Sequence, residues 1–186
     1  MAIEKLTDKE LYRKYLDGDQ KSFEELVLRY KNQIIFFISR YTKNTAVAED
    51  ISQDVFVYLL LNKEQYNFQY SFKTYIFMIA KCRAINYIKK EKKMVTINEL
   101  DNLSTCDKEL EEIIYKKEKE RKIKIAMNQL KADYQVVIYL TTFEGMKYKE
   151  VAKIMNKNIG QIKSMLNRAR KKLKKLLEKE GIYDEK

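Results

Sequence analysis

The sequence predicts an all-α protein, and three observations support this. The 186-residue chain contains no proline and only four glycines, so turn-forming residues are too scarce for a many-stranded sheet. Lys, Glu, Leu, Ile and Tyr dominate the composition. In most long segments apolar residues recur every three or four positions, the periodicity of an amphipathic helix. Hydrophobic residues make up 45% of the chain, which is enough for compact cores at this length.

A first helical domain is expected over residues 1–93. Helices are predicted at 22–41 (SFEELVLRYKNQIIFFISRY), 48–61 (AEDISQDVFVYLLL) and 72–90 (FKTYIFMIAKCRAINYIKK). In the first of these segments Phe23, Leu26, Tyr30 and Ile34 step by three or four residues, which favours one buried face. The polar and aromatic stretch at 62–71 (NKEQYNFQYS) is interpreted as a loop.

A linker is expected over residues 94–108, and a second helical domain over 109–186. In 94–108 the long periodicity is lost and turn-favouring residues cluster, although a short ordered connector would look the same. Near the end of the chain, two helices are predicted on either side of a polar break that contains Asn156 and Asn158. Asn tolerates the left-handed backbone conformation that a tight turn requires. The second of these helices is expected to begin near Gly160.

The net charge of +11 is concentrated in the second domain. Between Lys147 and Lys175, eleven basic residues accompany one acidic residue, Glu150. Such a cluster predicts binding to a polyanion, because Lys and Arg neutralise phosphates and release counterions. The alternative is a solvated, lysine-rich terminal helix. The two-helix context favours DNA, since a helix-turn-helix places its second helix in the major groove.

The last helix has two different faces. An apolar stripe is expected to pack on the preceding helices, and it comprises Ile159, Ile162, Leu166, Ala169, Leu173 and Leu176. The opposite face is polar and supplies the candidate DNA-contacting residues: Gln161, Lys163, Ser164, Asn167, Arg168 and Lys171. Residues near the beginning of the helix would contact base edges.

An acidic helix face is predicted in the first domain. Asp50 and Asp54 are four residues apart, so they share one side of a helix together with Gln53. This face could increase solubility or bind a partner. Paired carboxylates can also perform acid–base catalysis, but here they follow helical surface spacing and the chain contains no histidine, so an enzyme is not expected.

Aromatic and basic residues alternate along residues 66–90. Unpaired bases stack on aromatic rings while cations hold the backbone, so this pattern suits single-stranded DNA. In the loop, Tyr66, Phe68 and Tyr70 are the candidate stacking rings, whereas the helical rings Phe72, Tyr75 and Phe77 are expected in the core. The accompanying cations are Lys73, Lys81, Arg83, Lys89 and Lys90.

Composition argues against several other classes of protein. Cys82 and Cys106 have no metal-binding spacing and no histidine accompanies them, so neither a zinc site nor a disulfide framework is expected, and no cofactor is implied. No apolar run reaches the roughly 20 residues of a membrane span, and the beginning of the chain lacks the apolar stretch of a signal peptide. We therefore expect a cytoplasmic protein. Binding of the basic amphipathic helix to an anionic membrane surface is a weaker alternative.

Residues in both domains resemble those of bacterial extracytoplasmic-function sigma factors of the sigma-70 family. In the second domain the segment 143–173 resembles their C-terminal helix-turn-helix, with matches at Phe143, Glu144, Gly145, Tyr148, Glu150, Val151, Ala152, Gly160, Ile162, Lys163, Ser164, Leu166, Arg168, Ala169, Arg170 and Leu173. In the first domain the matches include Gly18, Asp19, Phe23, Leu26 and Tyr30, then Asp50, Gln53, Asp54, Val55 and Phe56, and the segment 72–90.

The resemblance implies a function for each domain. Residues 1–93 would be sigma region 2, which binds the beta-prime clamp helices of core RNA polymerase through Asp50, Gln53, Asp54 and Phe56. This domain would also open the upstream-of-start promoter element at the loop and cations described above. Residues 109–186 would be sigma region 4, which reads the distal promoter element and contacts the beta flap. An anti-sigma factor is a further possible partner. The alternative is a stand-alone helix-turn-helix regulator, which would leave the resemblance of the first domain unexplained.

The chain departs from the family pattern at five positions. Tyr75 stands where Trp is usual, Cys82 where Asn is common, and Asn156 where the turn usually has Gly. In the recognition helix Met165 replaces a common Arg and Gln161 a common Thr. These changes alter what would touch DNA, so the resemblance implies no particular promoter sequence.

Overall fold

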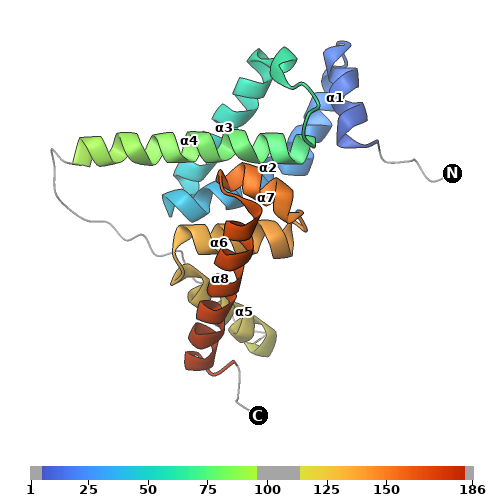
Figure 1. Ribbon diagram of the computed structural model, residues 1–186. Helices are drawn as coiled ribbons and strands as arrows, with labels where there is room; N and C mark the ends of the chain where they lie inside the picture. The colour runs from blue at the N-terminus through green and yellow to red at the C-terminus, as the bar shows by residue number, and fades with distance from the viewer. Residues whose placement is uncertain (1–5, 96–113, 183–186) are drawn as a thin grey trace. The chain divides into compact units, whose positions relative to one another are not determined.

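The computed structural model describes residues 6–95 and 114–182, and every regular element in those residues is helical. This confirms the predicted all-α fold class (Figure 1). The chain divides into two compact units, which are described separately below. The boundary between the units and most of the predicted 94–108 linker lie outside the described residues.

In its described residues, 6–95, the N-terminal unit contains four α-helices and one short 3-10 helix. They are α1 (Asp8–Leu16), α2 (Gln20–Thr42), α3 (Thr45–Leu61), η1 (Lys63–Gln65) and α4 (Phe72–Val95). Helix α2 packs against α1, α3 and α4, so it is the central helix of the unit. Residues 62–71 join α3 to α4 and contain only η1 as regular structure, which agrees with the loop predicted there.

Polar side chains define where these helices begin. The Thr7 hydroxyl accepts a hydrogen bond from the backbone N–H of Glu10, and the Glu10 carboxylate accepts one from the backbone N–H of Thr7. This capping box satisfies two N–H groups that the first turn leaves without helical partners. Asp19 caps α2 and Asn44 caps α3 in a similar way. At the end of α2, Lys43 adopts the left-handed conformation, with φ of 55°.

The core of the N-terminal unit lies between α2 and the helices around it. Leu26, Ile34 and Phe37 of α2 are completely buried. The ring of Phe37 meets the ring of Phe77 edge to face, with 5.0 Å between the ring centroids. Phe72 and Phe77 of α4 are buried as well, which confirms that these two rings belong to the core. Burial of such side chains is the main source of stability for a helical unit of this size.

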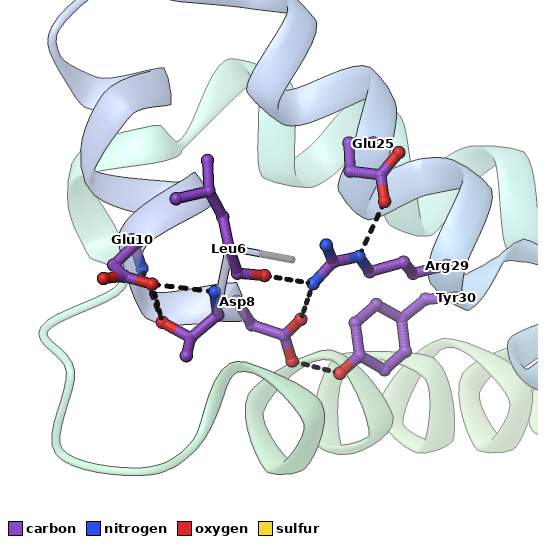
Figure 2. Close-up of polar contacts among 7 residues, drawn as sticks. Leu6, Asp8, Glu10, Glu25, Arg29 and Tyr30 are labelled. Atoms are coloured by element: carbon purple, nitrogen blue, oxygen red, sulfur yellow. Dashed lines mark hydrogen bonds and ion pairs between the residues drawn. The ribbon is translucent and has the colours of Figure 1, made fainter. Parts of the chain in front are cut away.

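The beginning of α1 is held by a network of charged groups (Figure 2). The Asp8 carboxylate accepts hydrogen bonds from the Tyr30 hydroxyl and from Nη1 of Arg29, the latter at 3.1 Å. Arg29 also donates to the Leu6 carbonyl and to Oε1 of Glu25, both at 2.8 Å. Because Arg29, Tyr30 and Glu25 belong to α2, this network attaches the N-terminal end of α1 to the central helix.

The C-terminal unit contains α5 (Ile114–Asn128), α6 (Ala132–Ile138), a π-helical turn η2 (Tyr139–Phe143), α7 (Tyr148–Met155) and α8 (Ile159–Lys179). Helix α8 packs against α6 and α5. At Tyr139, helix α6 widens into the π-helical turn. Such turns are often found at functional sites.

Candidate nucleic-acid and protein interfaces

The turn between α7 and α8 is built by two asparagines. Asn156 has a φ of 53°, and the backbone N–H of Lys157 bonds to the Ala152 carbonyl at 2.9 Å, which closes α7 with a Schellman-type turn. Asn158 then begins α8 with a capping box that it shares with Gln161. Both asparagines therefore perform the local roles that the polar break predicted, and α8 begins at Ile159, one residue before the predicted Gly160.

The predicted DNA-contacting face of α8 is exposed along its whole length. All six candidate residues are exposed: Gln161, Lys163, Ser164, Asn167, Arg168 and Lys171. Three of them are already partly engaged. The side-chain oxygen of Gln161 accepts the backbone N–H of Asn158 at 2.9 Å, so the amide NH2 group is the part of Gln161 that remains for a base. Arg168 donates to the Ser164 hydroxyl at 2.9 Å, which orients the guanidinium along the helix.

The buried side of α8 differs from the predicted stripe at its two ends. Ile162, Leu166 and Ala169 are buried as expected. Ile159 is 43% exposed, whereas Leu177, which the stripe did not include, is buried. Ile159 and Leu177 are eighteen residues apart, which is five full turns of a helix, so they lie on the same side of α8 and its first turn is simply less covered than its last.

The acidic residues of α3 lie on one exposed face. Asp50, Gln53 and Asp54 are all exposed, while Ile51, Val55 and Leu59 on the other side of the helix are buried. Three large apolar side chains lie further along the same exposed face. They are Val57, which is 51% exposed, Leu60, which is 44% exposed, and Leu61, which is 75% exposed. Carboxylates beside uncovered apolar side chains suit a protein partner better than DNA, because DNA repels acids and offers few apolar groups.

Phe56 does not share this acidic face. It lies two residues beyond Asp54, about 200° around the helix, and it is 9% exposed in the core of the unit. The predicted partner-binding set is therefore split by the structure. Asp50, Gln53 and Asp54 form a common surface, and Phe56 supports α3 from the buried side.

The three predicted stacking rings of the 62–71 loop have different environments. Tyr66 is only 4% exposed, and its ring stacks on that of Tyr75 with 4.9 Å between centroids. Burial raises the pKa of Tyr66 to about 12. Phe68 and Tyr70 are half-buried and keep accessible ring surface. Tyr75, predicted to be core, is also half-buried. The rings available to a stacking base are thus Phe68, Tyr70 and Tyr75.

The five predicted cations of α4 do not form one surface. Lys81 and Arg83 are two residues apart, so they lie on opposite flanks of the buried face. Arg83 and Lys90 are seven residues apart and share one flank, where the Arg83 guanidinium lies 5.1 Å from the Tyr58 ring centroid. Lys73 and Lys81 are half-buried, whereas Lys89 and Lys90 are exposed.

Helix α1 holds the 62–71 loop in place, and the sequence reasoning did not assign it a role. The Tyr12 hydroxyl donates to the Lys63 carbonyl at 2.9 Å, and the Tyr15 hydroxyl donates to the Leu60 carbonyl at 3.3 Å. The Tyr12 ring is fully buried and contacts Tyr66 edge to face at 4.8 Å. The T-x-x-E pattern from Thr7 to Glu10 was the available sequence signal for this helix.

The described parts of the chain hold neither a metal-binding cluster nor a helix able to span a membrane. Within residues 6–95 and 114–182, no group of three or more His, Cys, Asp or Glu residues could hold a metal ion. Among the helices of those same residues, none combines the length and the apolar character that crossing a membrane requires.

Both units match known protein families. Residues 26–94 match the family described as Sigma-70 region 2, and residues 121–173 match Sigma-70, region 4. The chain is 27% identical over 177 residues to the ECF RNA polymerase sigma-E factor of Escherichia coli K12, covering 90% of this chain and 92% of that protein. It is 29% identical over 164 residues to the ECF RNA polymerase sigma factor SigM of Bacillus subtilis, covering 88% of this chain and 99% of SigM.

Two solved structures share the fold. One is the sigma factor RpoE, crystallised with the anti-sigma factor NepR from Bartonella quintana, with a TM-score of 0.70 and 23% identity. The aligned region covers 85% of this chain and 98% of the RpoE chain. The other is CnrH in complex with the cytosolic domain of CnrY, with a TM-score of 0.64 and 19% identity. The aligned region covers 92% of this chain and 97% of the CnrH chain.

Proposed function

We propose the function of this chain from the family to which it belongs. The chain is a sigma factor of the sigma-70 family and of the extracytoplasmic-function class. It binds core RNA polymerase and directs promoter-specific initiation of transcription. The observation that carries this function is that region 2 and region 4 matches occur in one chain, on two separate helical units. The chemistry of RNA synthesis belongs to the polymerase, and this chain supplies binding surfaces.

The acidic face of α3 is the proposed polymerase-docking surface. Asp50, Gln53 and Asp54 would contact the beta-prime clamp helices, and the exposed Val57 and Leu61 would extend that contact. Acidic groups at the edge of an apolar patch direct a basic partner into register, while the apolar side chains contribute affinity on burial. Phe56 would act indirectly, by holding α3 in place.

The 62–71 loop and the beginning of α4 are proposed to capture the unpaired strand of the upstream-of-start element. Phe68 and Tyr70 supply accessible ring surface, and Lys73 lies at the start of the following helix. Arg83 and Lys90, on one flank of α4, would contact phosphates of the same element. Lys81 and Lys89 would add to the positive electrostatic potential around those phosphates. Tyr66 would support the loop from the core.

The exposed face of α8 is proposed to read the distal promoter element in duplex form. Gln161, Lys163 and Ser164 lie nearest its N-terminal end, where a recognition helix contacts base edges. Asn167, Arg168 and Lys171 lie further along, where phosphate contacts are expected.

Further partners are proposed from the family. The C-terminal unit would contact the beta flap of the polymerase, and an anti-sigma factor would bind the chain, as the anti-sigma factor NepR binds RpoE in the similar solved structure. The protein would act in the cytoplasm, because core polymerase and promoter DNA are found there. No cofactor is proposed.

Transcription from a genomic template tests this function. The protein is mixed with bacterial core polymerase and fragmented genomic DNA, and the RNA 5′ ends are sequenced. We expect discrete new start sites that require both proteins, preceded by a shared sequence motif. Replacement of Asp54 by Arg should abolish these starts, while replacement of the exposed Glu24 on α2 should leave them unchanged.

Nuclease footprinting on the same genomic DNA distinguishes the alternative of a stand-alone regulator. A stand-alone helix-turn-helix protein would protect specific duplex sites from nuclease digestion without polymerase. Such footprints, combined with an absence of new start sites, would refute the proposed function.

A further inference from the structure

The side-chain amide of Gln161 has a fixed orientation at the beginning of α8. Its Oε1 accepts the backbone N–H of Asn158 at 2.9 Å, and Oδ1 of Asn158 accepts the backbone N–H of Gln161 at 2.8 Å. A backbone N–H only donates, so the atom of Gln161 that faces Asn158 has to be the amide oxygen. The capping box therefore directs this oxygen back toward the N-terminal end of the helix, and the exposed NH2 group remains for a ligand.

The other two side chains proposed to contact base edges also present donors. The Ser164 hydroxyl oxygen accepts a hydrogen bond from Nη2 of Arg168 at 2.9 Å, so the hydroxyl hydrogen remains for another partner. The ammonium group of Lys163 can only donate. Gln161 and Ser164 are three residues apart, so they are neighbours on one side of α8 and would meet the same short stretch of the groove.

Acceptors are scarce along this part of α8. From Ile159 to Leu177 the helix contains no aspartate or glutamate, and its first acidic residue is Glu178. Asn167 is the next exposed side chain with an amide oxygen, and it lies about 120° around the helix from Gln161. The first turns of the exposed face therefore offer hydrogen-bond donors to DNA and little that can accept.

We propose that Gln161 is a specificity-determining residue, and that it selects a guanine on the strand that it contacts in the distal promoter element. In the major groove guanine presents two acceptors, O6 and N7. Adenine presents one acceptor beside an amino donor, and cytosine presents an amino donor alone. The NH2 group of Gln161 suits the guanine edge, whereas the amino group of adenine or cytosine would need the oxygen that the capping box already engages.

This inference rests on the proposed function and adds to it the base that the helix selects. Gln161 stands where the family commonly has Thr, so the selection is particular to this chain and does not follow from the family pattern. The shorter hydroxyl of Thr can both donate and accept. The amide of Gln161 reaches further from the helix and is oriented by its own cap.

Transcription from a set of competing templates tests this selection. The templates carry one promoter, mapped as described above, in which each base pair of the distal element is changed in turn to the three alternatives. The full-length protein and core polymerase transcribe all templates together, and the RNA from each template is counted by sequencing. For the wild type we expect one position at which guanine exceeds each other base by about tenfold, the order of one specific base contact.

Two substitutions of Gln161 should change the preference at that position and at no other. Gln161→Glu keeps the capping box, because a carboxylate oxygen accepts the same N–H, but it replaces the donors with an acceptor. The preferred base should therefore change from guanine to cytosine, whose N4 amino group donates. Gln161→Ala should reduce the preference to within about twofold. Each variant is compared with itself across the templates, so a loss of stability lowers all counts and leaves their ratios unchanged.

Lys174→Gln is the matched control. It changes the net charge by the same one unit as Gln161→Glu, at an exposed position on the same helix. It should lower transcription from all templates alike, because a charge acts on phosphates irrespective of sequence. Retention of the guanine preference by Gln161→Glu or Gln161→Ala, loss of it in Lys174→Gln, or its absence in the wild type would overturn the inference. A wild-type protein that produces no new start sites with core polymerase would instead refute the proposed function.

Discussion

Removal of the Asp8 carboxylate should loosen α1 from the N-terminal unit. Asp8→Ala eliminates the bond from Arg29 and the bond from the Tyr30 hydroxyl. A charge-assisted hydrogen bond contributes about 1.5–3 kcal/mol, and a carboxylate in the first turn of a helix about 0.3–1 kcal/mol more. The Asp8 and Arg29 side chains are 27% and 18% exposed, so water replaces part of what is lost. We expect the free energy of unfolding of the N-terminal unit to fall by about 2–3 kcal/mol.

Urea unfolding of the full chain measures this change. The chain contains no tryptophan, so tyrosine fluorescence and circular dichroism report unfolding. The two units are expected to unfold in separate transitions, and the transition of the C-terminal unit serves as an internal reference. Asp17→Ala is the control, because Asp17 is exposed at the other end of α1, where a negative charge is not favoured by the helix dipole. If Asp8→Ala and Asp17→Ala unfold at the same urea concentration, the network does not hold α1 and the reasoning fails.

Four further predictions concern the remaining elements. Because burial raises the pKa of Tyr66 to about 12 and raises that of Tyr12 as well, the folded unit keeps protons that the unfolded chain releases above about pH 10. Its stability should be intact below that pH and fall as the pH rises toward 12, and tyrosinate absorbance should rise together with the loss of helicity; ionisation of both rings near pH 10 in a folded protein would contradict this. Asn158→Ala should destabilise the C-terminal unit by about 0.5–2 kcal/mol through loss of the α8 cap, measured by urea unfolding, and an unchanged midpoint would show that the cap is dispensable. Ile162→Ala should cost about 2–5 kcal/mol because this side chain is completely buried, and a smaller effect would mean that the site collapses around the cavity. Asp54→Arg should weaken binding to core polymerase at least tenfold in a pull-down titration without changing the unfolding midpoint, since the side chain is exposed; retention of wild-type affinity would remove α3 from the docking surface.

The helices could be predicted because their signals are local. Apolar spacing located α2, α3 and α4, and the two asparagines located the turn before α8. Phe56 shows where a family match and helix geometry give different answers. The match grouped Phe56 with Asp54, but two residues along a helix correspond to about 200°, so a residue near an exposed carboxylate at that spacing points into the core.

The environment of Tyr66 could not be predicted in the same way. Its burial depends on Tyr12, which lies more than fifty residues earlier in the chain and on a different helix. The Arg13 guanidinium, which lies 5.5 Å from the centroid of the Phe68 ring, depends on the same long-range packing for that position. Periodicity reports which side of a helix is buried, but it carries no information about which distant element covers a loop.

The π-helical turn was also beyond the reach of the sequence pattern. Tyr139 and Leu140 are buried while Phe143 is 69% exposed, so the added residue in the turn directs one large ring outward. A helix of ordinary pitch through the same residues satisfies the same apolar spacing.

Three tyrosine hydroxyl groups that support the 62–71 loop donate to main-chain carbonyls. Tyr12, Tyr15 and Tyr66 donate to the carbonyl oxygens of residues 63, 60 and 70, so the support does not depend on which side chains those residues carry. Substitutions at the exposed loop positions 64, 65, 67 and 69 leave these three bonds in place, and at 65 and 67 they remove only the additional hydrogen bonds that the Gln65 and Asn67 side chains make. A lineage could therefore exchange the loop's side chains one at a time, acquiring a different target, while the frame that presents them persists through every intermediate.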